Sequence, residues 1–289
     1  MENILEIKGL KKTFGDFTLD NISFSLPKGF ITGFIGPNGS GKTTTIKLIM
    51  NLLKKDSGDI RIFGLDPARQ EKEIKNRIGF VYDESHFYEE LTVEEMKRII
   101  APMYEQWDEQ QFQNYAAKFD LPGNKKTKEL SRGMKVKFSL AIALSHHADL
   151  LIMDEPTAGL DPVVRSEILD ILYALMQDEN KGVFFSTHIT SDLDRIADYI
   201  VMIYNGKILF CTQKDALMEN HAIVRGKTSL LDTVRCPDLK GIRMSRYGFE
   251  AMSAKKETTA AFAKAGAVID PPTLEDIMLY YTRKESSHA

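Results

Sequence analysis

The residues with the clearest chemical potential form a glycine-rich run at positions 36–44. Its letters, GPNGSGKTT, match the pattern G-x-x-x-x-G-K-[ST]. In such a loop backbone N–H groups converge on phosphate oxygens, the lysine balances phosphate charge and the next hydroxyl can bind Mg²⁺. The run follows the apolar segment ITGFI and leads into the segment TTTIKLIMNLL, whose apolar residues have helical spacing. This is the strand-loop-helix context that the chemistry needs. The sequence therefore predicts a P-loop made of Gly36, Pro37, Asn38, Gly39, Ser40, Gly41, Lys42, Thr43 and Thr44.

Two acidic residues end a second apolar run, LLIMDEP, at positions 150–156. A nucleotide in a P-loop needs a carboxylate beside its Mg²⁺, and a buried acid without such a role would be costly. We therefore expect Asp154 to hold the metal together with Thr43, and Glu155 to polarise the attacking water. Taken alone, the same letters also fit two acids that open a turn before Pro156.

A histidine ends a third apolar run, GVFFSTH, at position 188. Ligands of parallel α/β sheets bind where the strands end, so His188 is expected at the same edge as Glu155 and the P-loop. There it would contact the γ-phosphate as part of the catalytic set. A histidine at a strand end can also be purely structural, and it is the ordered series of motifs that favours the catalytic interpretation.

The pattern of apolar residues predicts the elements that hold these groups. Near-continuous apolar runs at 150–154, 182–187 and 199–204 are typical of parallel strands buried on both faces. Residues 4–35 predict a small antiparallel sheet, with runs broken at Gly9 and other turn residues, and apolar spacing over 91–145 predicts a helical insertion. The fold class is therefore α/β: a P-loop NTPase core with a parallel sheet, an N-terminal antiparallel β subdomain, a helical insertion and a small α+β C-terminal tail.

The character of the sequence changes near residue 218. We expect an ATPase domain over 1–217, with a helical subdomain at about 84–145, and a C-terminal accessory region over 218–289. In the tail, Thr273 followed by Asp276 predicts a helix start.

Composition excludes several classes of protein. The 289 residues are 43% apolar and 27% charged, as in ordinary globular proteins, and 38 basic against 41 acidic residues give a net charge of −3. That balance disfavours a nucleic-acid partner. The longest apolar run, Tyr199 to Tyr204, has six residues, against roughly 18 for a membrane-spanning helix. We therefore expect neither a membrane span nor secretion, and the two isolated cysteines favour a reducing, cytosolic setting.

Four motifs together resemble those of the ATP-binding cassette (ABC) ATPases. They are the P-loop, LSRGMK at 130–135, LLIMDEPTAGLD at 150–161 and STH at 186–188, and the resemblance covers about residues 3–215. It implies ATP and Mg²⁺ as ligands, and hydrolysis to ADP and phosphate. It also implies that Ser131 and Gly133 bind the γ-phosphate held by the other subunit, and that Asp161 lies in the D-loop between two nucleotide sites. From the sequence alone, Ser131 would be only a helix N-cap.

The chain departs from the family pattern at several positions. Arg132 stands where the family usually has Gly, and it could either add a cation near phosphate or face solvent. Asp83 stands where the family has a Gln that contacts Mg²⁺ and the coupling element of the membrane subunit, so Asp83 becomes a candidate metal ligand. Nearby, Phe87 and Tyr88 would give apolar contact to the docking helix. Phe14 matches the ring that stacks on adenine, although it could also be ordinary core.

The resemblance further implies a head-to-tail pair of cassettes on a membrane partner. We expect a homodimer, with a heterodimer also possible, docked on a separate transmembrane subunit at the cytoplasmic face of the cell membrane. The motif order and short tail look like bacterial exporter ATPases of the drug-resistance and antimicrobial-peptide type, including exporters of phenol-soluble modulins. One alternative is a soluble ATP-gated module acting on a protein or nucleic acid without transport, and another is an importer ATPase. The cargo would bind the membrane subunit, so this sequence does not reveal it.

Overall fold

The computed structural model describes residues 2–82, 87–234 and 238–283. The chain divides into two units, one made of residues 1–189 with 201–211, and the other of residues 190–200 with 212–289. Each unit has its own architecture and is described separately. The division of the chain at 217/218 stays a prediction.

An antiparallel sheet begins the first unit. It contains β1 (Asn3–Phe14), β2 (Phe17–Pro27) and β4 (Ser57–Ile62) in the order β2-β1-β4. Gly9 does not end a strand: it lies inside β1 with φ +60°, where the register shifts, and its N–H donates to Ser23 Oγ at 2.9 Å. The residue is therefore a bulge within one long strand, because glycine adopts this conformation without a Cβ clash.

A six-stranded sheet holds the predicted functional residues at its strand ends. Its order is β5-β6-β7-β3-β8-β9. The neighbours within β5 to β3 pair in parallel, and β6, β7 and β3 are fully buried, which confirms the predicted parallel core. The strands span Ile78–Val81 (β5), Leu150–Asp154 (β6), Gly182–Thr187 (β7), Ile31–Ile35 (β3), Tyr199–Tyr204 (β8) and Lys207–Gln213 (β9).

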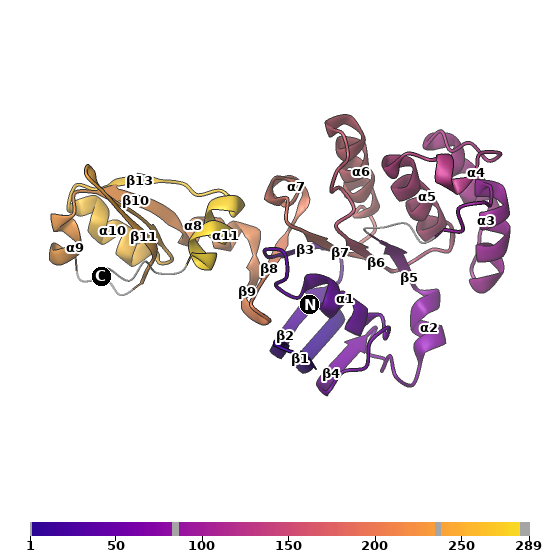
Figure 1. Ribbon diagram of the computed structural model, residues 1–289, viewed down its shortest axis with the longest axis horizontal. Helices are drawn as coiled ribbons and strands as arrows, with labels where there is room; N and C mark the ends of the chain where they lie inside the picture. Colours follow the sequence, from indigo (N-terminus) through magenta and orange to yellow (C-terminus); the bar gives the residue numbers. More distant parts are fainter. Residues whose placement is uncertain (1, 83–86, 235–237, 284–289) are drawn as a thin grey trace. The chain divides into compact units, whose positions relative to one another are not determined.

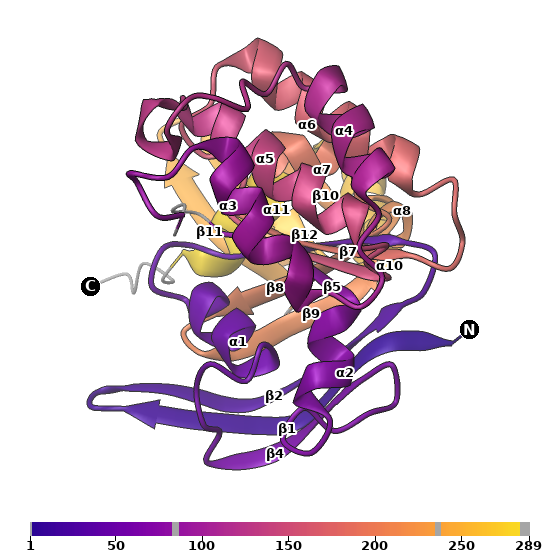
Figure 2. The same cartoon turned by 90° about the vertical axis from the view of Figure 1, so that its right-hand side faces the viewer.

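Helices of the first unit cover both sides of this sheet. Helix α1 (Lys42–Ile49) lies between the six-stranded and the three-stranded sheet, where apolar residues of both sheets and of α1 form one core (Figure 1). On the opposite side lie α6 (Pro162–Leu175) and the helical insertion (Figure 2). The insertion contains α3 (Val93–Ile100), η1 (Ala101–Met103), α4 (Glu109–Lys118), η2 (Thr127–Glu129) and α5 (Arg132–Ser145), and α2 (Glu71–Asn76) precedes β5.

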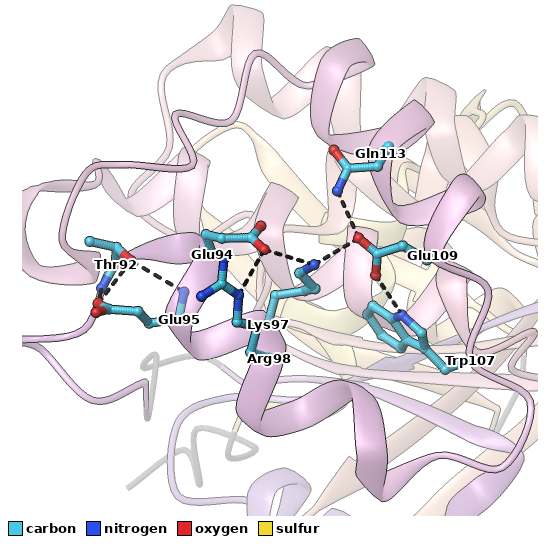
Figure 3. A network of polar contacts seen from close by, with 8 residues as sticks. All are labelled: Thr92, Glu94, Glu95, Lys97, Arg98, Trp107, Glu109 and Gln113. Atoms are coloured by element: carbon cyan, nitrogen blue, oxygen red, sulfur yellow. Dashed lines mark hydrogen bonds and ion pairs between the residues drawn. The ribbon is translucent and has the colours of Figure 1, made fainter.

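A polar network joins α3 to the start of α4 (Figure 3). The Lys97 side chain is almost buried and lies 2.9 Å from a Glu94 oxygen and 2.7 Å from a Glu109 oxygen. Burial pulls the pKa of Glu109 upward, but hydrogen bonds from Lys97, Gln113 and Trp107 outweigh it and hold that pKa at about 2. The network ties α3 to the start of α4, because the ammonium of Lys97 has a carboxylate partner on each helix.

The second unit has a four-stranded antiparallel sheet of its own, in the order β11-β12-β10-β13. A small core behind it contains Val224, Phe249 and Phe262. The predicted helix start at Thr273 is confirmed: Thr273 and Asp276 form a capping box at the first turn of α11 (Leu274–Thr282). The other elements are α7 (Thr190–Ile196), α8 (Lys214–Asn220), β10 (Ala222–Gly226), α9 (Ser229–Thr233), β11 (Leu239–Ser245), β12 (Gly248–Ser253), α10 (Lys256–Lys264) and β13 (Val268–Asp270).

Candidate nucleotide site

A cavity of about 470 Å³ opens where β3, β6 and β7 end. The motifs that were expected at this sheet edge supply most of its wall. Its lining residues are Phe17, Asn38, Gly39, Gly41, Lys42, Thr43, Thr44, Glu155, Ala158 and His188.

The P-loop is shaped by close contacts that only glycine permits. A Cβ on Gly36 would lie 2.2 Å from the Ile203 carbonyl oxygen, and Gly41 has φ +113° at the N-cap of α1. The buried Lys42 ammonium donates to the Gly36 carbonyl at 2.8 Å. Ser40 Oγ is buried and has no hydrogen-bond partner within the described part of the chain. The loop therefore places the Lys42 cation at the cavity, as a phosphate cradle requires, whereas Ser40 does not line the cavity.

Glu155 lies between two basic side chains. One of its carboxylate oxygens is 3.3 Å from Lys42 Nζ, and the other is 2.7 Å from His188 Nδ1 and also accepts the His188 backbone N–H. The Glu155 side chain is only 12% exposed, and its residue has φ +48°, with its N–H donating to the Ser186 carbonyl. The structure thus brings together the three groups that were predicted from separate motifs.

Asp154 and Thr43 are the groups that could hold a metal ion. Asp154 is buried at the end of β6 and accepts a hydrogen bond from Ser186 Oγ at 3.0 Å, whereas Thr43 is exposed in the first turn of α1. Among the described residues, no group of three or more His, Cys, Asp and Glu side chains could hold a metal. One carboxylate and one hydroxyl fit Mg²⁺, which keeps several water ligands and takes others from a nucleotide. Asp83 lies outside the described residues.

Phe17 lines the cavity and Phe14 does not, and stacking of Phe14 on adenine stays a prediction. The Phe17 ring is half-buried and lies 3.1 Å from where a Cβ on Gly41 would be. Phe14 is 40% exposed at the end of β1, with Lys12 Nζ 5.3 Å from its ring centroid, and it does not line the cavity. Sequence reasoning missed Phe17, because only the β1–β2 hairpin pairing of Phe14 with Phe17 brings the second ring beside the P-loop.

The signature and D-loop residues do not line this cavity. Ser131 is the N-cap of α5 and accepts the Met134 N–H at 3.2 Å, as the sequence indicates. Asp161 is the N-cap of α6 and accepts the N–H groups of Val163 and Val164. Ser131 is exposed, so its hydroxyl is open to a ligand from outside this cavity.

A second cavity of the first unit, about 500 Å³, is largely apolar and lies among α2, β5 and the helical insertion. Phe87 lines it and packs on Phe138, with ring centroids 4.6 Å apart, whereas Tyr88 is 67% exposed and does not line it. We call this cavity the insertion groove. Its lining residues are Met50, Leu52, Lys72, Lys75, Asn76, Ile78, Phe80, Tyr82, Phe87, Met96, Ile100, Met103, Tyr104, Ser139 and Ile142.

Comparison with known proteins identifies the family of this chain. A family model described as ABC transporter matches residues 19–158. The bacitracin transport ATP-binding protein BcrA of Bacillus licheniformis is 36% identical over 214 residues, 72% of this chain and 69% of BcrA. The chain belongs to the ATP-binding subunits of ABC transporters. Such a subunit is an ATPase. That the cavity holds its nucleotide stays a prediction.

Further relatives support the assignment of this ATP-binding subunit. The lantibiotic transport ATP-binding protein SrtF of Streptococcus pyogenes is 34% identical, over 73% of this chain and 92% of SrtF. A solved ATP-binding subunit of an ABC transporter superposes with a TM-score of 0.68 at 28% identity, over 75% of this chain and 92% of its own. No helix in the described part of this subunit has the length and apolar character that crossing a membrane requires.

Proposed function

We propose that this ATPase powers a separate transmembrane subunit that exports antimicrobial peptides or drugs. The observation that carries the proposal is the Glu155 carboxylate held between Lys42 and His188 at the P-loop cavity. BcrA and SrtF, by their names, serve bacitracin and lantibiotic transport, and these cargo classes are the ones we propose here. The subunit would act at the cytoplasmic face of the cell membrane.

In the proposed mechanism, backbone N–H groups of the P-loop and the Lys42 ammonium bind the phosphates. Thr43 and Asp154 would hold Mg²⁺, which supplies charge neutralisation for the transferred phosphoryl group. Glu155 orients and polarises the attacking water, and His188 positions the Glu155 carboxylate through its ring and backbone N–H. Lys42 then has two roles, since its positive charge offsets the negative charges of both the phosphates and Glu155.

We propose that two subunits share each nucleotide. The hydroxyl of the exposed Ser131 and the backbone N–H of the buried Gly133, both at the start of α5, would bind the γ-phosphate held by the partner copy. The absence of both residues from the lining of this chain's own cavity supports that arrangement. Copies of this chain suffice for a homodimer, and a heterodimer with a related subunit would use the same contacts.

We propose that the insertion groove receives a helix of the transmembrane subunit. Its wall is mostly apolar, and Leu52, Tyr82 and Met103 are exposed there by 48%, 39% and 65%. Exposed apolar side chains that line one concavity are typical of a binding site for an amphipathic helix. Phe87 would be one of the contacts.

The decisive experiment compares Glu155→Gln with the wild-type subunit. We expect turnover to fall about 100-fold or more, because an amide cannot take a proton from water, while ATP affinity changes little. Lys42→Ala is the contrast, since loss of the cation should weaken ATP binding itself. ATPase assays and titration with a fluorescent ATP analogue measure both effects, and wild-type turnover in Glu155→Gln would reject the role of Glu155.

The alternative of a soluble module makes a different prediction. Purification from native membranes should recover a transmembrane protein with this subunit. Recovery of RNA or a soluble protein alone would favour the module instead.

A further inference from the structure

Two glycines in separate motifs each face a side chain of the other motif. Gly133 of the signature segment is buried, and a Cβ there would lie 2.6 Å from Val164 Cγ1 in the first turn of α6. Gly159 of the D-loop has φ +68°, and a Cβ there would lie 3.4 Å from Arg132 Nη1 and 3.9 Å from Arg132 Cζ. The start of α5 and the loop before α6 therefore interlock within one chain.

Further contacts keep these two elements in register. Lys137 of α5 forms an ion pair with Glu167 of α6, one helical turn beyond the interlocked glycine. Asp161 fixes the position of Val164 by accepting its N–H at 3.1 Å. Helices α5 and α6 thus form one packed pair whose N-terminal ends both lie at the interlock.

The D-loop is also connected to Glu155 through short turns. The Ala158 N–H donates to the Glu155 carbonyl at 3.2 Å, and the Leu160 N–H donates to the Thr157 carbonyl at 3.2 Å. Thr157 is buried, so this stretch has little freedom to rearrange. A displacement of Gly159 would therefore reach the backbone that holds the Glu155 carboxylate.

We propose that Arg132 is a positioning residue that braces the D-loop through Gly159, and that it does not bind phosphate. The inference rests on the proposed function, in which α5 serves the partner's nucleotide and Glu155 serves the chain's own. The planar guanidinium lies within van der Waals distance of the position where a Gly159 side chain would begin, so it is a neighbour of the D-loop backbone. Arg132 thereby links the signature segment, which serves the partner's nucleotide, to the D-loop beside Glu155, which serves the chain's own nucleotide.

The first test separates positioning from phosphate binding. In Arg132→Gly we expect kcat to fall about tenfold while the KM for ATP stays within about twofold, because the D-loop loses a support and no phosphate ligand is removed. Arg132→Lys should not restore kcat, since an ammonium has no planar face, whereas it would rescue a phosphate ligand that needs only charge. Lys135→Ala, one turn along α5, is the matched control. A raised KM with kcat retained, or full rescue by Arg132→Lys, would overturn the proposal.

The second test is a double-mutant cycle between Arg132→Gly and Gly159→Ala. The strain of a positive φ at Gly159→Ala is present in both backgrounds and cancels, so the cycle isolates the contact with Arg132. We expect the two changes to be non-additive in kcat and in the free energy of unfolding, because the methyl group added at Gly159 would lie 3.4 Å from Arg132 Nη1. Additive effects would overturn the proposal.

Hydrogen exchange gives a measurement that does not need ATPase activity. Amides of residues 157–161 should exchange faster in Arg132→Gly than in the wild type and in Lys135→Ala. Unchanged exchange would overturn the positioning role even if the subunit hydrolyses ATP. Faster exchange in a chain that lacks ATPase activity would instead count against the proposed function alone.

Discussion

At the scale of single residues, the nucleotide site depends on groups that restrain one another. Lys42 donates to the Gly36 carbonyl and pairs with Glu155, which in turn accepts from His188. The Glu155 side chain is only 12% exposed, and the Lys42 ammonium and the His188 ring lie within 3.3 and 2.7 Å of its two carboxylate oxygens. The same contacts keep its oxygens at the edge of the cavity.

Variants of Phe17 and Phe14 should differ in their affinity for ATP. Phe17→Ala should weaken ATP binding about fivefold to 50-fold, the loss of one stacking contact, because its ring lines the cavity. Phe14→Ala should change affinity by less than about twofold. Titration of each variant with a fluorescent ATP analogue tests this. The reverse order would identify Phe14 as the stacking residue, as the family resemblance implies.

The functional residues differ in how well the sequence predicts them. Lys42, Glu155 and His188 could be predicted because each motif needs its residue type at a fixed place after a strand. Phe17 could not, because its position depends on the pairing of two strands and not on a motif. The contact of Arg132 with Gly159 was also beyond reach, since the sequence left Arg132 either near phosphate or in solvent.

At the scale of elements, the insertion groove gives a prediction for docking. Phe87→Ala should weaken binding of the transmembrane subunit about tenfold, because it removes a ring from the apolar wall, while basal ATPase activity stays unchanged. Tyr88→Ala is the matched control, since Tyr88 is exposed outside the groove. Copurification and partner-stimulated ATPase assays measure both. An equal loss in the two variants would place the docking surface elsewhere.

A buried histidine behind the groove gives a prediction for pH. His146 stacks on Tyr104 at 3.7 Å, and burial lowers its pKa to about 4 from 6.5. The unfolded chain therefore binds more protons between these values, and stability falls as pH falls through that window. The contribution of His146 to this loss is about 3 kcal/mol.

The measurement compares unfolding by urea from pH 4 to pH 7.5. In His146→Gln the loss of stability on acidification should be smaller, although the variant is less stable at neutral pH because the ring contacts are gone. The variant of the exposed neighbour, His147→Gln, is measured for comparison. An equal slope in His146→Gln and wild type would contradict the assignment.

The elements also differ in how far the sequence predicts them. The parallel strands were predictable because burial on both faces demands continuous apolar runs. The long β1 was not, because Gly9 signals a break in sequence but acts as a bulge inside a paired strand.

At the scale of the whole molecule, the proposed shared sites predict complementation between copies. A Ser131→Arg chain mixed with a Glu155→Gln chain would form heterodimers in which one site carries both changes and the other carries neither. Some ATPase activity should return when the two inactive parents are mixed, up to about half of the wild-type activity per dimer. Each parent alone is the control. Failure to recover activity in confirmed heterodimers would contradict sharing.

The second unit takes its residues from two separate stretches of chain. Thr190, two residues after His188, begins the first stretch, and α7 within it packs against α11 from the end of the described chain. A graft that moved only the C-terminal residues onto another cassette would therefore bring α11 without the helix it covers. Chimaeras of this protein should unfold in a single cooperative transition only when residues 190–200 and residues 212–289 are transferred together.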